Sequence, residues 1–368
     1  MAETVLASVK VGHEKMELQE FPMPDVPEDG AILKVEAAGV CGSDVHGFHG
    51  DRNTPNIMGH ENVGRIYKIG KVAERIWGVK EGDRVAVEEY LPCLHCEYCR
   101  QGEYRHCLAT DASANDQALR YGSTTTKITP ALWGGYSQYT YLPPQAVLHH
   151  MPEHVPNDQS ALALPIGNGI QWACIEGGAA PGKIVWIQGP GQQGLGCVLA
   201  ARIAGADMII VTGLTKDTER FEVAKQLGAD YTIDVQKEDL PTRMREITNG
   251  HGVDIIVDTT NGAPASIMAE AIEIMTRKGG VYVAQGYYGK IDQFPIDRLT
   301  RKYITLKSAR GHSYASVELA IKRIAGGKYP LDIMCTHQFG LKDVDLAIHT
   351  TGGTGQPGGV HVTVNPWL

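Results

Sequence analysis

The chain has 368 residues, 43% of them hydrophobic and 21% charged, with a formal net charge of −8. This length exceeds that of an average single domain, so two domains with separate cores are expected. The acidic balance, without Lys/Arg runs among aromatic residues, excludes a general polyanion-binding surface, and nucleic acid is not an expected partner. Residues 1–10 show no basic segment followed by a long apolar run, and no stretch is apolar enough to span a bilayer, so we predict a cytoplasmic protein.

Residues 1–156 are predicted to form a mostly β domain, because short β-rich runs such as Ala31–Glu36 and Arg84–Val87 alternate with Gly, Pro and Asp turns. One stretch of this domain concentrates a thiol, two imidazoles, a hydroxyl and two carboxylates beside glycines that allow tight turns. It reads Gly39-Val40-Cys41-Gly42-Ser43-Asp44-Val45-His46 and, after a polar loop, Gly59-His60-Glu61. This composition is typical of a metal or catalytic site.

Four of the eight cysteines crowd together further along the same domain as C-x2-C-x2-C-x7-C, at Cys93, Cys96, Cys99 and Cys107. In a reducing compartment such a cluster indicates metal rather than disulfides. Four thiolates at this spacing can surround one tetrahedral Zn²⁺ and leave no open position, which predicts a structural zinc lobe over residues 93–107. Iron–sulfur ligation is the main alternative, but the known close-spaced run differs in spacing and is followed by proline.

From residue 157 to about residue 306, helical patterns alternate with short apolar strands, which is typical of a parallel sheet built from βαβ units. The expected strands are Lys183–Gln188, Met208–Thr212, Tyr231–Asp234, Val253–Asp258 and Val281–Ala284. The tail, residues 307–368, is expected to rejoin the first domain. The tail is predicted to carry a strand near Ile304–Ser308, a helix near Tyr314–Ala325 and a last strand near Val360–Val364.

A G-x-G-x-x-G motif follows the first of these strands and opens an apolar helix, which is the context that dinucleotide binding requires. Gly189 permits the tight turn, Gly191 lets the backbone approach a pyrophosphate, and Gly194 lets the helix pack on the strand. The helix N-terminus supplies N–H groups and dipole for the phosphates. The motif therefore predicts a dinucleotide-binding site on this domain.

The end of the next strand holds Gly213, where an acidic residue usually binds the adenosine ribose. This leaves room for a 2′-phosphate, with Lys216 or Arg220 as its partner. Alternatively, Asp217 or Glu219 reaches back to an unphosphorylated ribose. The choice between NAD and NADP stays open at this point.

These motifs together resemble the zinc-dependent medium-chain alcohol dehydrogenases over nearly the whole chain, and most closely the sorbitol and threonine dehydrogenase branch, which shares the Cys-Gly-Ser-Asp-Val-His string. The resemblance implies an α/β fold in which a Rossmann doubly wound parallel sheet accompanies a mostly β GroES-like catalytic domain. It also implies hydride transfer between NAD(P)⁺ and a secondary, polyol or cyclic alcohol. The expected assembly is a homodimer or homotetramer joined through the nucleotide domain, without nucleic-acid or membrane partners.

The resemblance assigns Cys41 and His60 as catalytic zinc ligands, and a thiolate and an imidazole suit this borderline-soft cation. Glu61 would be an exchangeable ligand or a carboxylate next to the metal. Asp44 would accept the other imidazole N–H of His60 and so fix its tautomer.

Ser43 would take the proton of the alcohol and pass it, through the cofactor ribose, towards His46. A Lewis acid lowers the pKa of an alcohol without a strong base. The alternatives are that Ser43 is an ordinary helix cap and that His46 is a solvated surface histidine.

One position departs from the family pattern, because the third protein ligand, a Glu or Asp before proline, falls on Leu164. Leucine cannot coordinate zinc. Either Glu61 ligates directly, or zinc binds weakly, or the catalytic metal is lost. The last case would favour a zinc-free enone or enoyl reductase, and a dinucleotide sensor without turnover is a further alternative. Retention of the six polar site residues from Cys41 to Glu61 argues for a working zinc site.

Substrate and nicotinamide contacts are weakly indicated. Aromatic and apolar residues that would either line a substrate pocket or belong to the core are Tyr90, Trp133, Tyr136 and Ile170. Gly286, followed by Tyr287 and Tyr288, stands after the last predicted strand, where a nicotinamide would lie at the carboxyl edge of the sheet.

Overall fold

The computed structural model describes residues 3–51, 54–264, 266–276, 279–286, 291 and 294–368. The chain divides into two compact units. The first combines Met1–Leu164 with Ser313–Leu368, and the second comprises Pro165–His312. Within the described residues, no helix is both long enough and apolar enough to cross a membrane.

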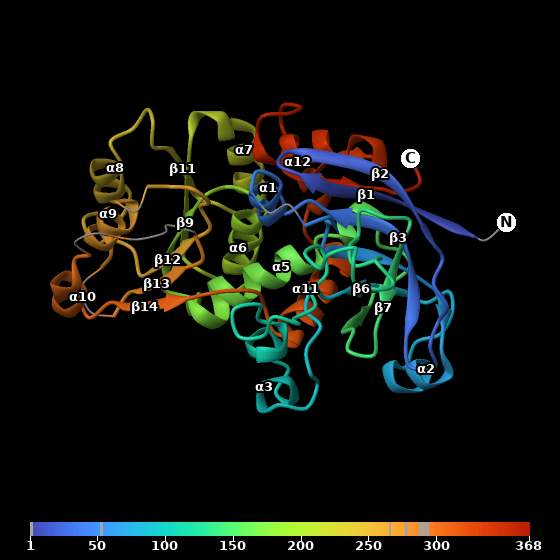
Figure 1. Cartoon of the computed structure of the whole chain (residues 1–368). Helices are drawn as coiled ribbons and strands as arrows, with labels where there is room; N and C mark the ends of the chain where they lie inside the picture. The colour runs from blue at the N-terminus through green and yellow to red at the C-terminus, as the bar shows by residue number, and fades with distance from the viewer. Residues whose placement is uncertain (1–2, 52–53, 265, 277–278, 287–290, 292–293) are drawn as a thin grey trace. The chain divides into compact units, whose positions relative to one another are not determined.

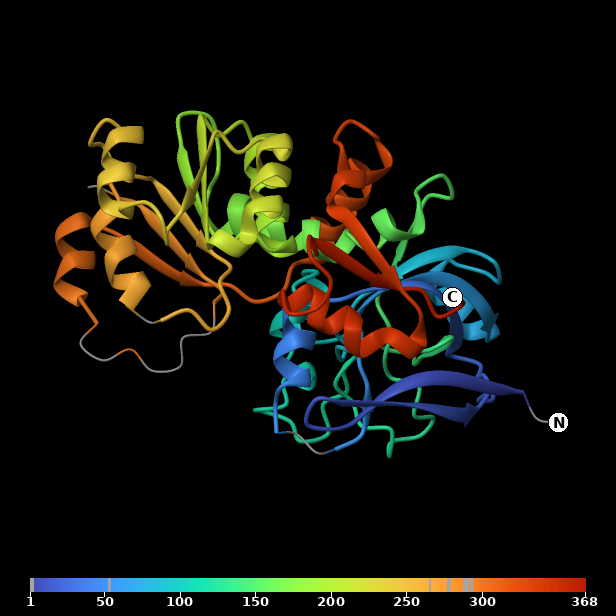
Figure 2. The same ribbon diagram turned by 90° about the horizontal axis from the view of Figure 1, so that it is seen from above.

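The first unit is built on two sheets. A three-stranded sheet has the order β2-β1-β4, and its β1–β2 hairpin is visible in Figures 1 and 2. The larger, seven-stranded sheet has the order β15-β16-β3-β5-β6-β8, with β7 paired to β3. The strands are β1 (Thr4–Gly12), β2 (Lys15–Pro22), β3 (Ala31–Gly39), β4 (Asn56–Ile57), β5 (Glu61–Ile69), β6 (Arg84–Val87), β7 (Tyr139–Leu142), β8 (Leu148–His150), β15 (Cys335–Phe339) and β16 (His361–Val364).

Short helices fill the connections of this unit. They are α1 (Gly42–Phe48), α2 (Lys71–Trp77), α3 (Glu97–Arg100), α4 (Asn157–Ser160), α11 (Tyr314–Ala325) and α12 (Val344–Gly352). The strand β3 is buried along most of its length and pairs antiparallel with β5, in a register that sets Gly39 opposite Glu61. The two predicted halves of the metal motif therefore meet where the end of β3 faces the start of β5.

The second unit contains a six-stranded sheet with the order β11-β10-β9-β12-β13-β14, and all its neighbouring strands are parallel. This is the doubly wound arrangement, in which the first strand, β9, lies at the switch point between the two halves. The strands are β9 (Ile184–Gln188), β10 (Met208–Gly213), β11 (Tyr231–Asp234), β12 (Ile255–Asp258), β13 (Val281–Ala284) and β14 (Thr305–Ser308).

The helices of the second unit alternate with these strands, as the sequence predicts. They are α6 (Gln192–Ile203), α7 (Thr218–Leu227), α8 (Leu240–Ile247), α9 (Ser266–Ile274) and α10 (Ile296–Lys302), preceded by α5 (Ala163–Gly169) and a π-helical segment (Ile170–Glu176). The helix α6 packs closely on the preceding segment, because a Cβ on Gly169 would lie 2.2 Å from the backbone of Gly196. Small residues at this contact bring α6 against its neighbour.

One sequence prediction about this sheet was wrong. The strand near Ile304–Ser308 was expected to return with the tail to the first domain, but β14 pairs with β13, with Val281 opposite Thr305. This strand is mostly exposed at the edge of the sheet, so its residues lack the continuous apolar run by which the inner strands were recognised.

Candidate catalytic metal site

The N-terminus of α1 presents the first part of the site. Cys41 is the N-cap residue of this helix, and its backbone N–H donates to Oδ2 of Asp44 at 3.0 Å. Asp44 is buried and also accepts from the backbone N–H of Gly59 at 3.4 Å and from the hydroxyl of Tyr136 at 3.1 Å. Because these donors hold the carboxylate in place, the Asp44 side chain is rigidly positioned for one further contact.

His60 is that contact, since its Nδ1 lies 3.4 Å from Oδ1 of Asp44. The opposite ring nitrogen, Nε2, lies 3.3 Å from Oγ of Ser43 and 3.9 Å from Oε2 of Glu89. Burial alone lowers the pKa of His60, but the charge and hydrogen bond of Asp44, with contributions from Cys41 and Glu89, outweigh it and raise the pKa well above its ordinary value. The ring is thus oriented with Nδ1 on the carboxylate of Asp44 and Nε2 towards Ser43 and Glu89.

Glu61 follows directly at the start of β5 and is 2% exposed. A Cβ built on Gly39 of the paired strand would lie 2.3 Å from its Oε2, so the absence of a side chain at Gly39 makes the space for this carboxylate. Cys41, His60 and Glu61 each offer one ligand atom, and these three atoms lie within 4.8 Å of one another. A sulfur, a nitrogen and an oxygen this close suit Zn²⁺ in both chemistry and size.

Two further predicted residues lie on α1, and both side chains are exposed. Ser43 approaches Nε2 of His60, the nitrogen that would face a metal, whereas His46 stands one helical turn further along. Leu164, at the position of the usual third ligand, is buried with 3% exposure and provides no donor atom. Any oxygen ligand beyond Cys41 and His60 must come from another residue.

The four cysteines of the predicted lobe also converge, with sulfur atoms within 4.8 Å of one another. Sγ of Cys96 lies 3.4 Å and Sγ of Cys93 4.0 Å from Sγ of Cys99. Thiolates about 2.3 Å from a tetrahedral Zn²⁺ would be about 3.8 Å apart, so the observed spacing fits the ion. The backbone N–H of His95 is the main reason why the pKa of Cys93 falls to about 6 despite the opposing effect of burial.

A buried polar network anchors this lobe to the rest of the first unit. The hydroxyl of Tyr104, in the lobe, donates to Oε1 of Glu88, which is fully buried at the end of β6. Oε1 of Glu88 also lies 3.0 Å from Nε2 of His149, whose Nδ1 lies 2.7 Å from Glu318 on α11. Tyr314 stacks on the imidazole of His149, with ring centroids 4.3 Å apart. The lobe is therefore tied to both β6 and α11.

In the second unit, the glycine motif adopts a strand-turn-helix geometry. Gly189 has a φ of +92°, which favours glycine, and Gly191 is the N-cap of α6 with nothing within 4 Å of an added Cβ. An added Cβ on Gly194 would lie 1.9 Å from the carbonyl oxygen of Gly189. The hydroxyl of Thr259 supports the turn by donating to the carbonyl oxygens of Gln188 and Gly189 at 2.8 Å and 3.0 Å. The turn is thus closed on one side and open at Gly191, as an approaching pyrophosphate requires.

The residues near the predicted ribose position differ in their contacts and in their exposure. Oδ2 of Asp217 accepts from the backbone N–H of Leu214 at 2.9 Å, and its Oδ1 lies 3.2 Å from Nη1 of Arg220. The carboxylate of Asp217 consequently has partners within its own turn, whereas the side chain of Lys216 is exposed. Gly213 is in close contact with Pro190, because a Cβ added to Gly213 would lie 2.9 Å from the Pro190 ring. Gly286 follows β13, while Tyr287 and Tyr288 lie outside the described residues.

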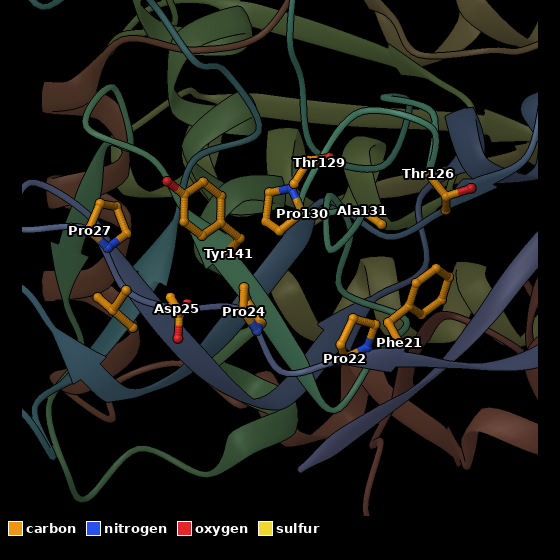
Figure 3. Close-up of a pocket in the computed structure, with 11 residues that line it drawn as sticks. Phe21, Pro22, Pro24, Asp25, Pro27, Thr126, Thr129, Pro130, Ala131 and Tyr141 are labelled. Carbon is orange, nitrogen blue, oxygen red and sulfur yellow. The ribbon is translucent and has the colours of Figure 1, made fainter. Parts of the chain in front are cut away.

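A separate pocket of about 690 Å³ opens in the first unit between residues 21–27 and residues 126–131, with Tyr141 at its side. Figure 3 shows that proline rings and the Tyr141 ring line much of it. Its one carboxylate is that of Asp25, and none of the predicted metal ligands or glycines is among its lining residues. This pocket is therefore distinct from the candidate metal and glycine clusters.

Comparison with known proteins agrees with this geometry. Residues 27–153 match the family model for the alcohol dehydrogenase GroES-like domain, and residues 194–326 match that for zinc-binding dehydrogenases. A probable alcohol dehydrogenase of Mycobacterium tuberculosis is 34% identical over 92% of this chain and 93% of its own length. The chain belongs to the zinc-dependent medium-chain alcohol dehydrogenase family.

Other members of this alcohol dehydrogenase family are similar over most of the chain. A sorbitol dehydrogenase of Halalkalibacterium halodurans is 30% identical over 90% of this chain and 91% of its own. An L-threonine 3-dehydrogenase of Pyrococcus horikoshii is 30% identical over 86% of each chain. The solved structure of a Thermotoga maritima alcohol dehydrogenase, 25% identical, superposes with a TM-score of 0.84 over 99% of both chains. These findings confirm the predicted family, its GroES-like and Rossmann folds, and an oxidoreductase that uses zinc and NAD(P).

Sequence reasoning did not assign two residues of this alcohol dehydrogenase that contact the site, Tyr136 and Glu89. Tyr136 was considered for a pocket or the core, and it is fully buried with its hydroxyl on Asp44. Tyr90, Trp133 and Ile170 are also buried. Glu89 was not recognised at all, although the Val-Glu-Glu-Tyr string at the end of a predicted strand was a usable signal.

Proposed function

We propose that Cys41, His60 and Glu61 hold the catalytic zinc of this alcohol dehydrogenase, and that the enzyme oxidises the secondary hydroxyl of a polyol or cyclic alcohol with NAD(P)⁺ as hydride acceptor. The observation that carries the proposal is the convergence of a thiol, an imidazole and a carboxylate within 4.8 Å, with Asp44 behind the imidazole. The zinc-free reductase alternative rests on Leu164, and it leaves these buried donors without a purpose.

Each residue has a defined task in this proposal. Zinc supplies Lewis acidity, which lowers the pKa of an alcohol so that its proton can leave at neutral pH. Asp44, fixed by three donors, keeps the proton of His60 on Nδ1 and turns Nε2 outward. Ser43, with Oγ 3.3 Å from Nε2, would accept the hydroxyl proton while giving up its own through the cofactor ribose, and His46, exposed on the same helix, would pass a proton to solvent.

The cofactor is proposed to bind at the turn formed by Gly189, Gly191 and Gly194, with its pyrophosphate at the N-terminus of α6. Gly286 would lie near the nicotinamide. At the ribose, the engagement of Asp217 with Leu214 and Arg220, together with the exposure of Lys216, favours Lys216 as the partner of a 2′-phosphate.

The sorbitol dehydrogenase and threonine dehydrogenase relatives support a polar secondary alcohol as substrate. A homodimer or homotetramer is proposed through the nucleotide domain. Support comes from the β14 edge, where the side chains of Ile296, Tyr303 and Leu306 are 61%, 75% and 42% exposed. An exposed strand edge with apolar neighbours favours pairing with another chain.

The test combines metal analysis with a substrate panel. Metal-replete protein should contain two zinc ions per chain, in agreement with two ligand clusters, and should oxidise polyols and cyclic alcohols faster than primary alcohols. In C41S, we expect one zinc and a loss of activity of about 10³-fold, equivalent to about 4 kcal/mol of transition-state stabilisation. Full turnover by protein that holds a single zinc in the cysteine lobe would refute the proposal.

A further inference from the structure

The carboxylate of Glu89 faces the same ring nitrogen of His60 that is proposed to bind zinc. Its Oε2 lies 3.9 Å from Nε2, on the side of the imidazole opposite to Asp44. Two ligands that bind a tetrahedral Zn²⁺ at about 2.1 Å are about 3.4 Å apart. A displacement of about half an ångström would therefore bring Glu89 and His60 to the spacing of two ligands of one ion.

Glu89 is held in this place by a neighbouring loop. Its other oxygen, Oε1, accepts from Nη2 of Arg120 at 2.5 Å. The guanidinium of Arg120 lies over the ring of Tyr90 at 4.6 Å, and its backbone N–H donates to Oγ1 of Thr124 at 2.8 Å. The backbone carbonyl of Glu89 accepts from Tyr121, so the two segments are joined on both sides of the ion pair. One carboxylate oxygen is thus anchored while the other faces His60.

Burial distinguishes the ion pair of Glu89 and Arg120 from an ordinary surface ion pair. The side chains of Glu89 and Arg120 are 15% and 22% exposed, and the imidazole of His60 is 12% exposed. An anchored carboxylate in such surroundings keeps its negative charge close to the metal position, where a divalent cation is the strongest available partner. Glu89 lies outside the cluster of Cys41, His60 and Glu61 and approaches it through His60.

We propose that Glu89 is a further ligand of the catalytic zinc and supplies the carboxylate that Leu164 cannot. This assignment rests on the proposed function, because it requires the zinc site at Cys41, His60 and Glu61. With zinc bound, Glu89 would supply a carboxylate oxygen to it, and Arg120 would hold that carboxylate in place.

The experiment measures zinc binding and not turnover. E89Q keeps the size of the side chain and removes its charge, and E89D keeps the charge on a shorter arm. E36Q is the matched control, because Glu36 is 18% exposed and pairs with Arg65 and Arg84, each at 2.8 Å. Chelator competition on the purified full chain measures the affinity of the second zinc. The zinc of the cysteine lobe reports on folding in each variant.

We expect E89Q to lose affinity for the second zinc by 10- to 100-fold, E89D by less, and E36Q not at all. In protein loaded with Co²⁺, the visible absorption bands should shift in E89Q and remain unchanged in E36Q. Unchanged affinity and an unchanged spectrum in E89Q would overturn the assignment of Glu89 and leave the proposed function intact. A single zinc per chain in both wild type and E89Q would overturn the proposed function, and the assignment with it.

Discussion

Replacing Gly39 with alanine should disturb the metal site while leaving the fold in place. The added Cβ would lie 2.3 Å from Oε2 of Glu61 and 3.1 Å from Cε1 of His361. Gly39 lies in β3 in an ordinary strand pairing, opposite Glu61, and its φ is not among the positive ones, so the backbone itself accepts an alanine. The clash therefore falls mainly on the end of the Glu61 side chain, which must move by about 1 Å to reach normal contact distance.

Such a displacement removes one of the three proposed donors from its position. We expect the second zinc to bind 10- to 100-fold more weakly in G39A, with the lobe zinc retained, because changes that reorient ligands have effects of this size. The crowding should destabilise the fold by about 1–3 kcal/mol, the usual effect of overpacking.

Zinc content after dialysis against a chelator, together with urea unfolding, measures both effects. G12A is the matched control, since a Cβ on Gly12 meets nothing within 4 Å. If G39A keeps both zinc ions at wild-type affinity, then the position of the Glu61 carboxylate does not matter for metal binding, and the reasoning fails.

Three other predictions concern pH, the lobe and the cofactor. Burial opposes the charge on His149, but its hydrogen bonds to Glu318 and Glu88 raise its pKa from 6.5 to about 8. The stabilisation from His149 is complete below pH 6.5 and is lost as the pH rises through 8. The free energy of unfolding in urea should therefore fall by about 2 kcal/mol between pH 6 and pH 9 in the wild type. The decrease should be much smaller in H149Q. Y104F, which loses the hydrogen bond to Glu88, should release lobe zinc to a chelator faster than wild type, and an equal rate would contradict the anchoring role. K216A should weaken NADP binding about fivefold with NAD binding unchanged in fluorescence titration, whereas equal effects on both would contradict a 2′-phosphate contact.

Sequence analysis predicted those parts of the molecule whose defining residues lie close together in the sequence. The inner strands of the second unit are short apolar runs, and the loop of Gly189, Gly191 and Gly194 directly follows one of them. The cysteine lobe and the Cys41–His46 string are likewise contiguous in sequence. The strand β14 was misassigned because an exposed edge strand carries no continuous apolar signal.

The supporting residues of the site could not be predicted in this way, because folding brings them together from distant positions. Tyr136 reaches Asp44 across 92 residues, and Arg120 reaches Glu89 across 31. No spacing rule connects such pairs before the sheet and its register are known. The space for the Glu61 side chain could not be predicted from the sequence either, since it depends on Gly39 lying opposite Glu61 in the paired strand.

Two adjacent carboxylates after β6 connect the cysteine lobe with the candidate zinc site within the first unit. Glu88 and Glu89 directly follow β6 in the sequence. Glu88 contacts Tyr104 of the lobe and His149, while Glu89 contacts Arg120 and approaches His60. Loosening the lobe would remove the hydrogen bond from Tyr104 to Glu88, and we expect the adjacent Glu89 to shift with it despite its contact with Arg120. We therefore expect the lobe, which has no open coordination position, to contribute to the geometry of the candidate zinc site.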